Sequence, residues 1–542
     1  MLANLHSILQ NHVSLTVSCI DRIYLNGYVP KLQTPGQLCF FLRDHLGYPI
    51  PSPALFRPMH DRFVRAVQDC ATEGQIPLVH FERGQRKDDI AAGYRARFTE
   101  AEGVVLIGVA QERAISFKAQ ETHGAMGRFF NFSRQPVSVN HYYFYLQDPA
   151  WGPAFVKVGT YLPYPVRVCL NGHEWVKQQL RREGIGFESL DNGFLSCQDP
   201  DRLQGICDAL SPEEVQGFFD RWVQRLPWPL TAADRTAGFG HRLALWQLEV
   251  SLTQVFDQPV QGRHFFEELI RENLDLGRPD RVSLLFPTKL IRTTPPPAYG
   301  YRTRVITEGV SPSLHVEYKH SHVKQYFKAE VPGAEGRALR TETTINDPAD
   351  FYCPKGLSHL PFLRAAGAQV NRKLLEVERI SQSCTLSQEA LDRLQHPTLE
   401  AGGRAPGLRF GDPRVMALFQ ALCGFAHLPQ GFRNRDLRPH IAGLLGLDET
   451  TYTANKMTYD LRRLRLKGII HRIPGTTRYT VTTYGLHVAL FSTKVYLRIL
   501  RPGWAALMPD PDNIPRPLAE ALLQVDTEVK SLCEAANLEA AA

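Results

Sequence analysis

The chain has 542 residues, of which 43% are hydrophobic and 22% are charged, and its formal net charge is +7. These values are typical of a globular protein with several cores, and they exclude a disordered or fibrous chain. The charge is too small for this length to require a polyanionic partner, because only local clusters of cations create a binding field.

The cysteines and the apolar runs favour a reducing compartment. The 10 cysteines contain no Cys-x-x-Cys pair, which predicts free thiols and a cytoplasmic protein. Met1 to Val13 lacks the basic start, apolar core and cleavage site of a secretory leader. No apolar run reaches the roughly 18 residues that a membrane-crossing helix needs, so we expect no membrane partner. The oligomeric state stays open.

The first part of the chain mixes strand and helix patterns. Alternating hydrophobicity predicts strands at Val13 to Pro30, near Ile76 to Phe81 and at Gly103 to Ala110. Helix-like stretches lie at about 36–46 and 59–73. Alternation of this kind indicates an α/β or α+β layered domain.

The next part is predicted to change from strands to helices. Tyr142 to Leu146, Phe155 to Tyr161 and Val166 to Leu170 have strand patterns, and a helix is expected from about His173. From Pro212 to about Asn273 the apolar spacing predicts a helical segment.

The densest group of reactive side chains lies on a predicted hairpin from His315 to Asp347. Its first strand, Leu314 to Lys328, has a period of two that places five of these side chains on one face. They are His320, His322, Lys324, Tyr326 and Lys328. The return strand, Arg337 to Asn346, carries Arg340 and Glu342, and the register decides whether Glu342 shares that face.

This set of residues predicts phosphodiester chemistry. Two histidines on one face can hold a divalent cation, Mg²⁺ or Mn²⁺, and the predicted metal ligands are His320, His322 and Glu342. Cleavage also needs cations that take up charge on the phosphate oxygens, a role that suits Lys324, Lys328 and Arg340. The alternative is a solvated, phosphate-binding sheet face without bond-making chemistry.

The hairpin resembles the Tyr-x-Lys and Leu-Arg-x-Glu strand pair of rolling-circle replication initiators from filamentous phages and some plasmids. The matching segments are Val323-Lys324-Gln325-Tyr326-Phe327-Lys328 and Ala338-Leu339-Arg340-Thr341-Glu342. Upstream, Leu170-Asn171-Gly172-His173-Glu174 resembles the Gly-His-Asn element of the phage group. The resemblance implies a nickase that joins a tyrosine to a 5′ phosphate, with Tyr326 or Tyr318 as nucleophile and Glu342 as metal ligand. We predict Tyr326, Glu342 and Lys328 as the catalytic residues.

Other sites stay open as alternatives. Asp280, Glu317 and Lys319 have the residue types of metal-dependent restriction-type nucleases, although Glu-x-Lys also occurs by chance on exposed strands. Asp21 on the opening strand is either a metal carboxylate or the cap of a turn. His173-Glu174 at a helix start fits metal binding and also fits stabilisation of the helix dipole by the glutamate.

Residues 432–483 carry two predicted helices followed by a hairpin. The first helix runs from about Asn434 to Leu445 and closes at Gly446. Thr453 caps the second, which is basic on one side and ends at Gly468. The order of elements is similar to that of a winged helix, in which the second helix enters the major groove while neighbouring cations hold phosphates.

The hairpin after these helices turns at Pro474-Gly475 and carries cations to its tip. The predicted nucleic-acid contacts in this region are Lys456, Arg462, Arg463, Arg465, Lys467, Arg472 and Arg478, and Lys324 and Arg340 extend them on the sheet. The alternatives are a protein-docking module and a basic face that is only solvated.

Together these patterns predict an α+β multidomain protein: mixed α/β sheet domains with a helical insertion and a C-terminal winged helix. The expected parts are 1–125, 126–278, the hairpin domain 279–394, a Pro- and Gly-rich linker at 395–412, the winged helix 413–505 and a tail 506–542. We expect a mobile-element protein of initiator, nickase or transposase type, with nucleic acid as partner and DNA favoured over RNA. The alternative is a non-enzymatic DNA- or RNA-binding regulator or assembly factor.

Overall fold

The computed structural model divides the chain into two compact units, which are described separately. The first comprises residues 1–268 and 283–372, and the second comprises 269–282 and 373–542. The described residues are 5–124, 127–265, 284–285, 301–308, 311–318, 320–328, 336–382, 386–400 and 403–500 without 427, 429 and 449, together with scattered positions between 517 and 531.

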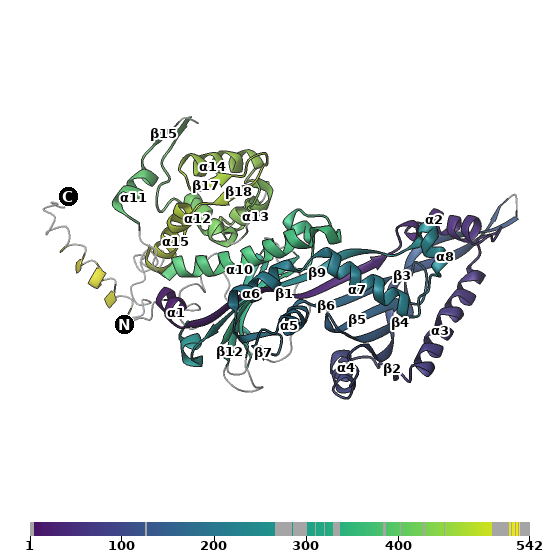
Figure 1. Ribbon diagram of the computed structural model, residues 1–542. Coiled ribbons are helices and arrows are strands. Elements are labelled where there is room, and N and C mark those ends of the chain that lie inside the picture. The colour runs from purple at the N-terminus through teal and green to yellow at the C-terminus, as the bar shows by residue number, and fades with distance from the viewer. Residues whose placement is uncertain are drawn as a thin grey trace. The chain divides into compact units, whose positions relative to one another are not determined.

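One large sheet runs through the first unit (Figure 1). Its neighbouring strands are antiparallel except in the pairs β2–β3 and β10–β11. From one edge to the other, the strands in the described residues are β10 (Leu284–Leu285), β11 (Tyr301–Glu308), β12 (Ser311–Tyr318), β13 (Ser321–Lys328), β14 (Ala338–Ile345), β9 (Arg242–Phe256), β1 (Val13–Tyr28), β6 (Val166–Asn171), β5 (Gly152–Gly159), β4 (Gly127–Asp148), β3 (Gly103–Gly124) and β2 (Leu78–His80). Segments that were predicted as three domains thus contribute strands to the same sheet.

Strand β9 corrects the predicted helical segment from Pro212 to Asn273. It lies between β1 and β14 in the middle of the sheet. Leu248, Val250 and Leu252 alternate with polar neighbours, which is the period of a strand, whereas Leu243, Trp246 and Val250 also fit the spacing of a helix. Because this segment pairs with β1 on one side and β14 on the other, it forms a strand and not a helix.

The first strand of the predicted hairpin is also corrected. The stretch from Leu314 to Lys328 forms two strands, β12 and β13, which pair with each other and turn back at His320. The return strand β14 agrees with the prediction and pairs with β13 on one side and β9 on the other.

Helices cover the sheet of the first unit. They are α1 (Leu5–Asn11), α2 (Pro35–Phe40), α3 (Phe56–Glu73), α4 (Lys87–Arg95), α5 (Gly172–Glu183), α6 (Pro200–Ala209), α7 (Pro212–Arg225), α8 (Ala232–Asp234) and the first part of α10 (Leu360–Gln382). A small separate hairpin consists of β7 (Phe187–Leu190) and β8 (Gly193–Cys197). Of the helices that the structure describes, none has both the length and the apolar character needed to cross a bilayer.

The first part of α10, up to Arg372, packs on one face of the central strands (Figure 1). The side chain of Asn371 donates to the carbonyl of Val250 at 2.9 Å and accepts from the hydroxyl of Thr343 at 2.7 Å. Because successive residues of a strand point to opposite faces, Ser251 and Glu342 point to the other face. That other face carries the polar side chains described below.

The second unit is mainly helical. Its elements are α11 (Gln388–Gln395), β15 (Thr398–Glu400), β16 (Gly403–Ala405), α12 (Pro413–Phe425), α13 (Asn434–Leu444), α14 (Ala454–Leu466), β17 (Ile470–Arg472), β18 (Tyr479–Val481) and α15 (Thr483–Val495). As predicted, Thr453 caps α14 by accepting from Lys456, and Gly446 and Gly468 after the two helices have positive φ. Helix α14 buries Met457, Leu461 and Leu464.

Candidate functional site

A bulge in β1 brings Asp21 into the centre of the polar face. The register between β1 and β9 shifts between Ile20 and Arg22, so Asp21 is the additional residue. Bulges re-aim side chains and are frequent beside functional sites. Helix α5 begins against this bulge, where a Cβ on Gly172 would lie 2.3 Å from the carbonyl oxygen of Ile20. Only glycine allows this approach, and Asp21 is left almost completely buried.

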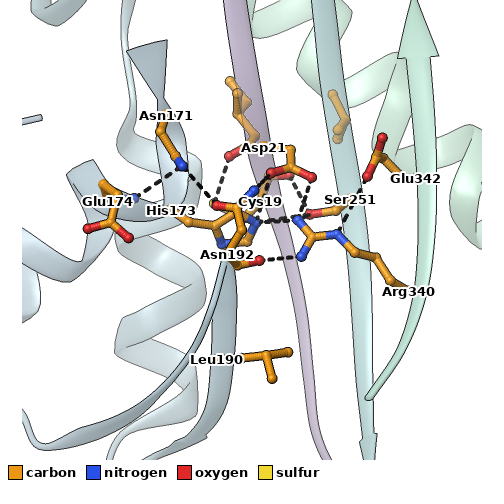
Figure 2. A network of polar contacts seen from close by, with 12 residues as sticks. Cys19, Asp21, Asn171, His173, Glu174, Leu190, Asn192, Ser251, Arg340 and Glu342 are labelled. Carbon is orange, nitrogen blue, oxygen red and sulfur yellow. Dashed lines mark hydrogen bonds and ion pairs between the residues drawn. The ribbon is translucent and has the colours of Figure 1, made fainter. Parts of the chain in front are cut away.

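Arg340 connects the elements around Asp21 (Figure 2). Its Nη2 atom lies 2.5 Å from Asp21 Oδ2, 2.8 Å from His173 Nε2 and 3.0 Å from Ser251 Oγ. Its Nη1 atom donates to the carbonyl of Asn192, whose side chain donates in turn to Asp21. The guanidinium is wholly buried, so one cation links β14, β1, β9, α5 and the turn between β7 and β8.

Burial sets the protonation of this network. Burial, together with the positive charge of Arg340, lowers the pKa of His173 well below its usual value. His173 is therefore a neutral imidazole, which can accept on Nε2 from Arg340. Burial and the neighbouring charge of Glu342 raise the pKa of Asp21, although Arg340 opposes the change. Among Arg340, His173, Asp21 and Glu342, only the guanidinium of Arg340 carries a positive charge.

Three carboxylates gather beside Arg340. One oxygen from each of Asp21, Glu249 and Glu342 lies within 4.8 Å of the others. Burial, followed by the charges of Glu342 and Asp21, raises the pKa of Glu249 to about 7. Carboxylate oxygens are the ligands that hard divalent cations prefer. These three residues, called the acidic cluster below, could hold a metal ion.

The predicted histidine ligands lie outside the acidic cluster. His320 is exposed in the turn before β13, where its backbone N–H donates to Asp350. His322 is paired with Thr344. It lies two residues before Lys324, which is the residue opposite Glu342. Within the described residues, the group of side chains that could hold a metal ion consists of Asp21, Glu249 and Glu342, which includes one of the three predicted ligands.

The register of β13 and β14 places Glu342 beside the predicted lysine and tyrosine. Lys324 is directly opposite Glu342, and its Nζ lies 2.8 Å from Oε1. The hydroxyl of Tyr326 donates to Oε2 at 3.0 Å. Burial would raise the pKa of Glu342, but Lys324 and then Arg340 lower it overall. Burial and the charge of Glu342 raise the pKa of Tyr326. The pair is therefore a protonated phenol and an ionised acceptor.

Lys328 completes the polar side chains of β13. Its Nζ lies 3.5 Å from the carbonyl oxygen of Asn192 and 3.8 Å from Asp191 Oδ2. Burial, followed by the charge of Arg340, lowers the pKa of Lys328 to about 8. A proton can thus leave or join this amine close to neutral pH. Arg340, by contrast, was predicted to bind phosphate and is instead buried as the partner of Asp21.

The second catalytic hypothesis falls largely outside the described residues. Asp280 and Lys319 are not among them, and the side chains of Glu317 and Tyr318 are not described either.

The predicted cations of the second unit divide into two groups. Lys456, Arg462, Arg465 and Arg472 are exposed, and Arg478 is half-buried. Lys467 is fully buried and donates to the carbonyls of Arg393 and His396. Arg463 donates to the carbonyl of Gly407 at 2.9 Å and lies 3.4 Å from Asp460. Lys467 and Arg463 were predicted to bind nucleic acid, but they hold the unit together because their side chains turn inward.

Glu249, Ser251 and Asn192 are site residues that the sequence analysis missed. Glu249 and Ser251 lie on β9, which was predicted to be helical, so their common face was not recognised. The alternation of Leu248, Val250 and Leu252 around them is the signal that could have indicated it. Asn192 lies in a tight turn and contributes through its carbonyl, which no residue pattern marks.

Comparison of the chain with protein-family models, with curated proteins and with solved structures gives no match.

Proposed function

We propose that this protein processes DNA by metal-dependent phosphodiester chemistry, as an initiator, nickase or transposase-like protein of a mobile element. The observation that carries the proposal is the contact between Tyr326 and Glu342, a member of the acidic cluster. A protonated nucleophile, an ionised acceptor and a set of oxygen ligands lie together on one sheet face. This combination can serve the transfer of a DNA strand to a tyrosine.

The proposed step uses three side chains of β13 and β14. The hydroxyl oxygen of Tyr326 attacks the phosphorus, and its proton passes to Glu342, which already accepts its hydrogen bond. The bond between phosphorus and the 3′ oxygen breaks, and that oxygen takes a proton from Lys328, whose pKa of about 8 suits a general acid. The products are a 5′-phosphotyrosine and a free 3′ hydroxyl. Lys324 lies beside the same carboxylate and can contact a phosphate oxygen.

The acidic cluster fits Mg²⁺ or Mn²⁺ as the cofactor. Asp21, Glu249 and Glu342 offer only oxygen ligands. The pKa values of Asp21 and Glu249 are raised mainly because burial leaves their negative charges poorly solvated. A divalent cation bound there would supply positive charge for the phosphate oxygens. The acidic side chains would keep that charge on the face where Tyr326 lies.

The second unit supplies the proposed contact with DNA. Its helices α13 and α14 and the hairpin β17–β18 follow the order of a winged helix, and Lys456, Arg462 and Arg465 are exposed on the second helix. Exposed cations on the helix and on the hairpin tip are what phosphate binding requires.

The proposal is tested with full-length protein and labelled single-stranded or supercoiled DNA in Mg²⁺ or Mn²⁺. We expect a protein–DNA adduct at a 5′ end that disappears with EDTA, in the variant Tyr326→Phe and in the variant Asp21→Asn. Tyr28→Phe is the matched control, because Tyr28 lies exposed at the end of β1. An adduct that persists in Tyr326→Phe, or wild-type protein without any metal-dependent cleavage, would overturn the proposed reaction.

One observation favours the non-enzymatic alternative, a DNA-binding regulator. Arg340 is buried and hydrogen-bonded to β1, β9, α5 and the turn between β7 and β8, which is also the arrangement of a purely structural polar network. If the wild-type protein binds DNA with the salt dependence of a cationic site but neither cleaves it nor forms an adduct, the alternative is the correct function.

A further inference from the structure

A pocket lies next to the acidic cluster on the same face of the sheet. It has a volume of about 190 Å³, and its walls include Arg22 and Tyr24 of β1, Arg95 of α4, Tyr145 of β4 and Asn171 at the start of α5. This volume is smaller than the roughly 300–1,000 Å³ of sites that enclose a drug-sized ligand. The pocket therefore suits one small group, such as a phosphate with part of its nucleoside.

Two contacts connect the pocket to the acidic cluster. Arg22 is the residue directly opposite Glu249 in the pairing of β1 with β9, so both side chains leave the same face. Asn171 donates to the side chain of Asn192 at 2.9 Å, and Asn192 donates to Asp21. Figure 2 shows Asn171 and Asn192 between α5 and Asp21. A ligand in the pocket would thus be a close neighbour of a phosphate at the acidic cluster.

The charges in the pocket favour an anion. Arg22 donates one N–H group to the hydroxyl of Tyr24, and a guanidinium has five N–H donors in total. Arg95 is half-buried, and its Nε has no hydrogen-bond partner among the described residues. Asp88 also lines the pocket, so the lining itself carries two guanidinium groups and one carboxylate, with Glu249 opposite Arg22 on the neighbouring strand. Arginine forks match the oxygens of a phosphate.

The aromatic side chains favour a base beside that anion. Tyr24, Tyr145 and Phe155 all line the pocket, and the last two have their ring centroids 5.9 Å apart. Nucleic acid bases stack on such rings with little dependence on sequence, and arginine planes add to the stacking. An inorganic anion has no ring that could stack on these aromatic side chains.

We propose that the pocket binds a phosphate and part of the adjoining nucleoside of one nucleotide in a single-stranded polynucleotide, near the phosphodiester that is held at the acidic cluster. This inference rests on the proposed function and specifies its substrate. A base that enters a pocket must first leave its stack, which costs least where the strand is already single, so a single-stranded substrate is favoured at this position.

The test is photochemical cross-linking of the full-length protein to a short single-stranded DNA that carries 5-iododeoxyuridine, followed by mass spectrometry of the modified peptides. We expect a cross-link at Tyr24, which is half-buried. Each of the variants Arg95→Gln and Arg22→Gln should weaken binding of this DNA by about tenfold, which is the loss of one charge-assisted hydrogen bond. The matched control is Arg97→Gln, because Arg97 lies just after the same helix but stacks on Tyr94 outside the pocket.

The outcomes separate this inference from the proposed reaction. Cross-links that map only to α14 and the C-terminal hairpin, or equal losses in the Arg95 and Arg97 variants, would overturn the pocket assignment even if metal-dependent cleavage is observed. Deoxythymidine monophosphate that competes as well as the oligonucleotide would also overturn it, since the ligand would then be a free nucleotide. Asp21→Asn should abolish cleavage and leave the pocket cross-link intact.

Discussion

The polar face of the sheet and the basic helix of the second unit hold their charges in opposite ways. On the sheet, Arg340, Asp21 and Glu342 are buried, and the guanidinium is paired with both carboxylates. On α14, Arg462 and Arg465 are exposed, and the inward-facing cations are those that hold the unit together. A buried charge is expensive to separate from its partner, whereas an exposed one is screened by water and salt. Substitutions should therefore change stability in the first region and binding in the second.

The largest effect is expected for Arg340→Met. It leaves Asp21 buried without its cation, and breaking a buried ion pair from one side costs about 3–5 kcal/mol. We expect urea denaturation to show a loss of this size in the free energy of unfolding.

The double variant Asp21→Asn with Arg340→Met is the control for this loss. It removes both charges, so it should be more stable than Arg340→Met alone. A double variant that is less stable than the single one would contradict the view that the guanidinium mainly compensates Asp21.

A smaller effect is expected from pH at His241, which has no neighbouring carboxylate among its described contacts. Its Nε2 donates to the carbonyl of Tyr164 at 2.8 Å, and its Nδ1 accepts from Trp228 at 3.3 Å, which fixes the neutral form. Burial, together with the charge of Arg235, lowers the pKa of His241 to about 4. Between pH 6.5 and 4 the unfolded chain binds this proton more readily than the folded one, so stability falls as the pH falls.

This contribution is at most about 3 kcal/mol at neutral pH. The difference in melting temperature between wild type and His241→Gln, measured from pH 7 to pH 4, isolates it from other groups. We expect the wild type to lose more stability than the variant over this range. Parallel curves would show that His241 titrates normally in the folded protein.

The smallest effect is expected for the double variant Arg462→Ala, Arg465→Ala. If these exposed cations bind phosphates, DNA affinity should fall by about 1–2 kcal/mol, and the slope of log K against log salt should fall by roughly 2. The melting temperature of the protein should hardly change. Lys467→Met is the matched comparison: it removes a buried amine that donates to Arg393 and His396, so stability should fall while the salt slope stays the same. A lower salt slope in Lys467→Met and lower stability in the arginine double variant would reverse the roles assigned to the two faces of α14.

Local signals explain which elements could be predicted from the sequence. Thr453, Gly446 and Gly468 determine the ends of α13 and α14 through caps and positive φ angles, and these ends agree with the structure. The pairing of β13 with β14 was also predicted from a local signal, because the two strands are close in the sequence. Contacts of this kind are determined by a few neighbouring residues.

The candidate site could be predicted only in part because most of it depends on distant pairings. Tyr326, Lys324 and Glu342 come from one hairpin and were identified together. Asp21 was one of several open candidates, and Glu249 joins it only because β1 pairs with β9. A bulge also decides the direction of Asp21, and the sequence contains no mark for a single additional residue in a strand.

The pairing of β1 with β9 also has a consequence for biosynthesis. Translation proceeds at about 5–20 residues per second, so the roughly 200 residues between the two strands take on the order of 10–40 s to emerge. During this time the nascent chain offers one side of β1 to any other extended segment nearby. Slow closure of so distant a pair predicts refolding yields that drop as protein concentration rises, and it makes binding by a chaperone during synthesis an advantage for this chain.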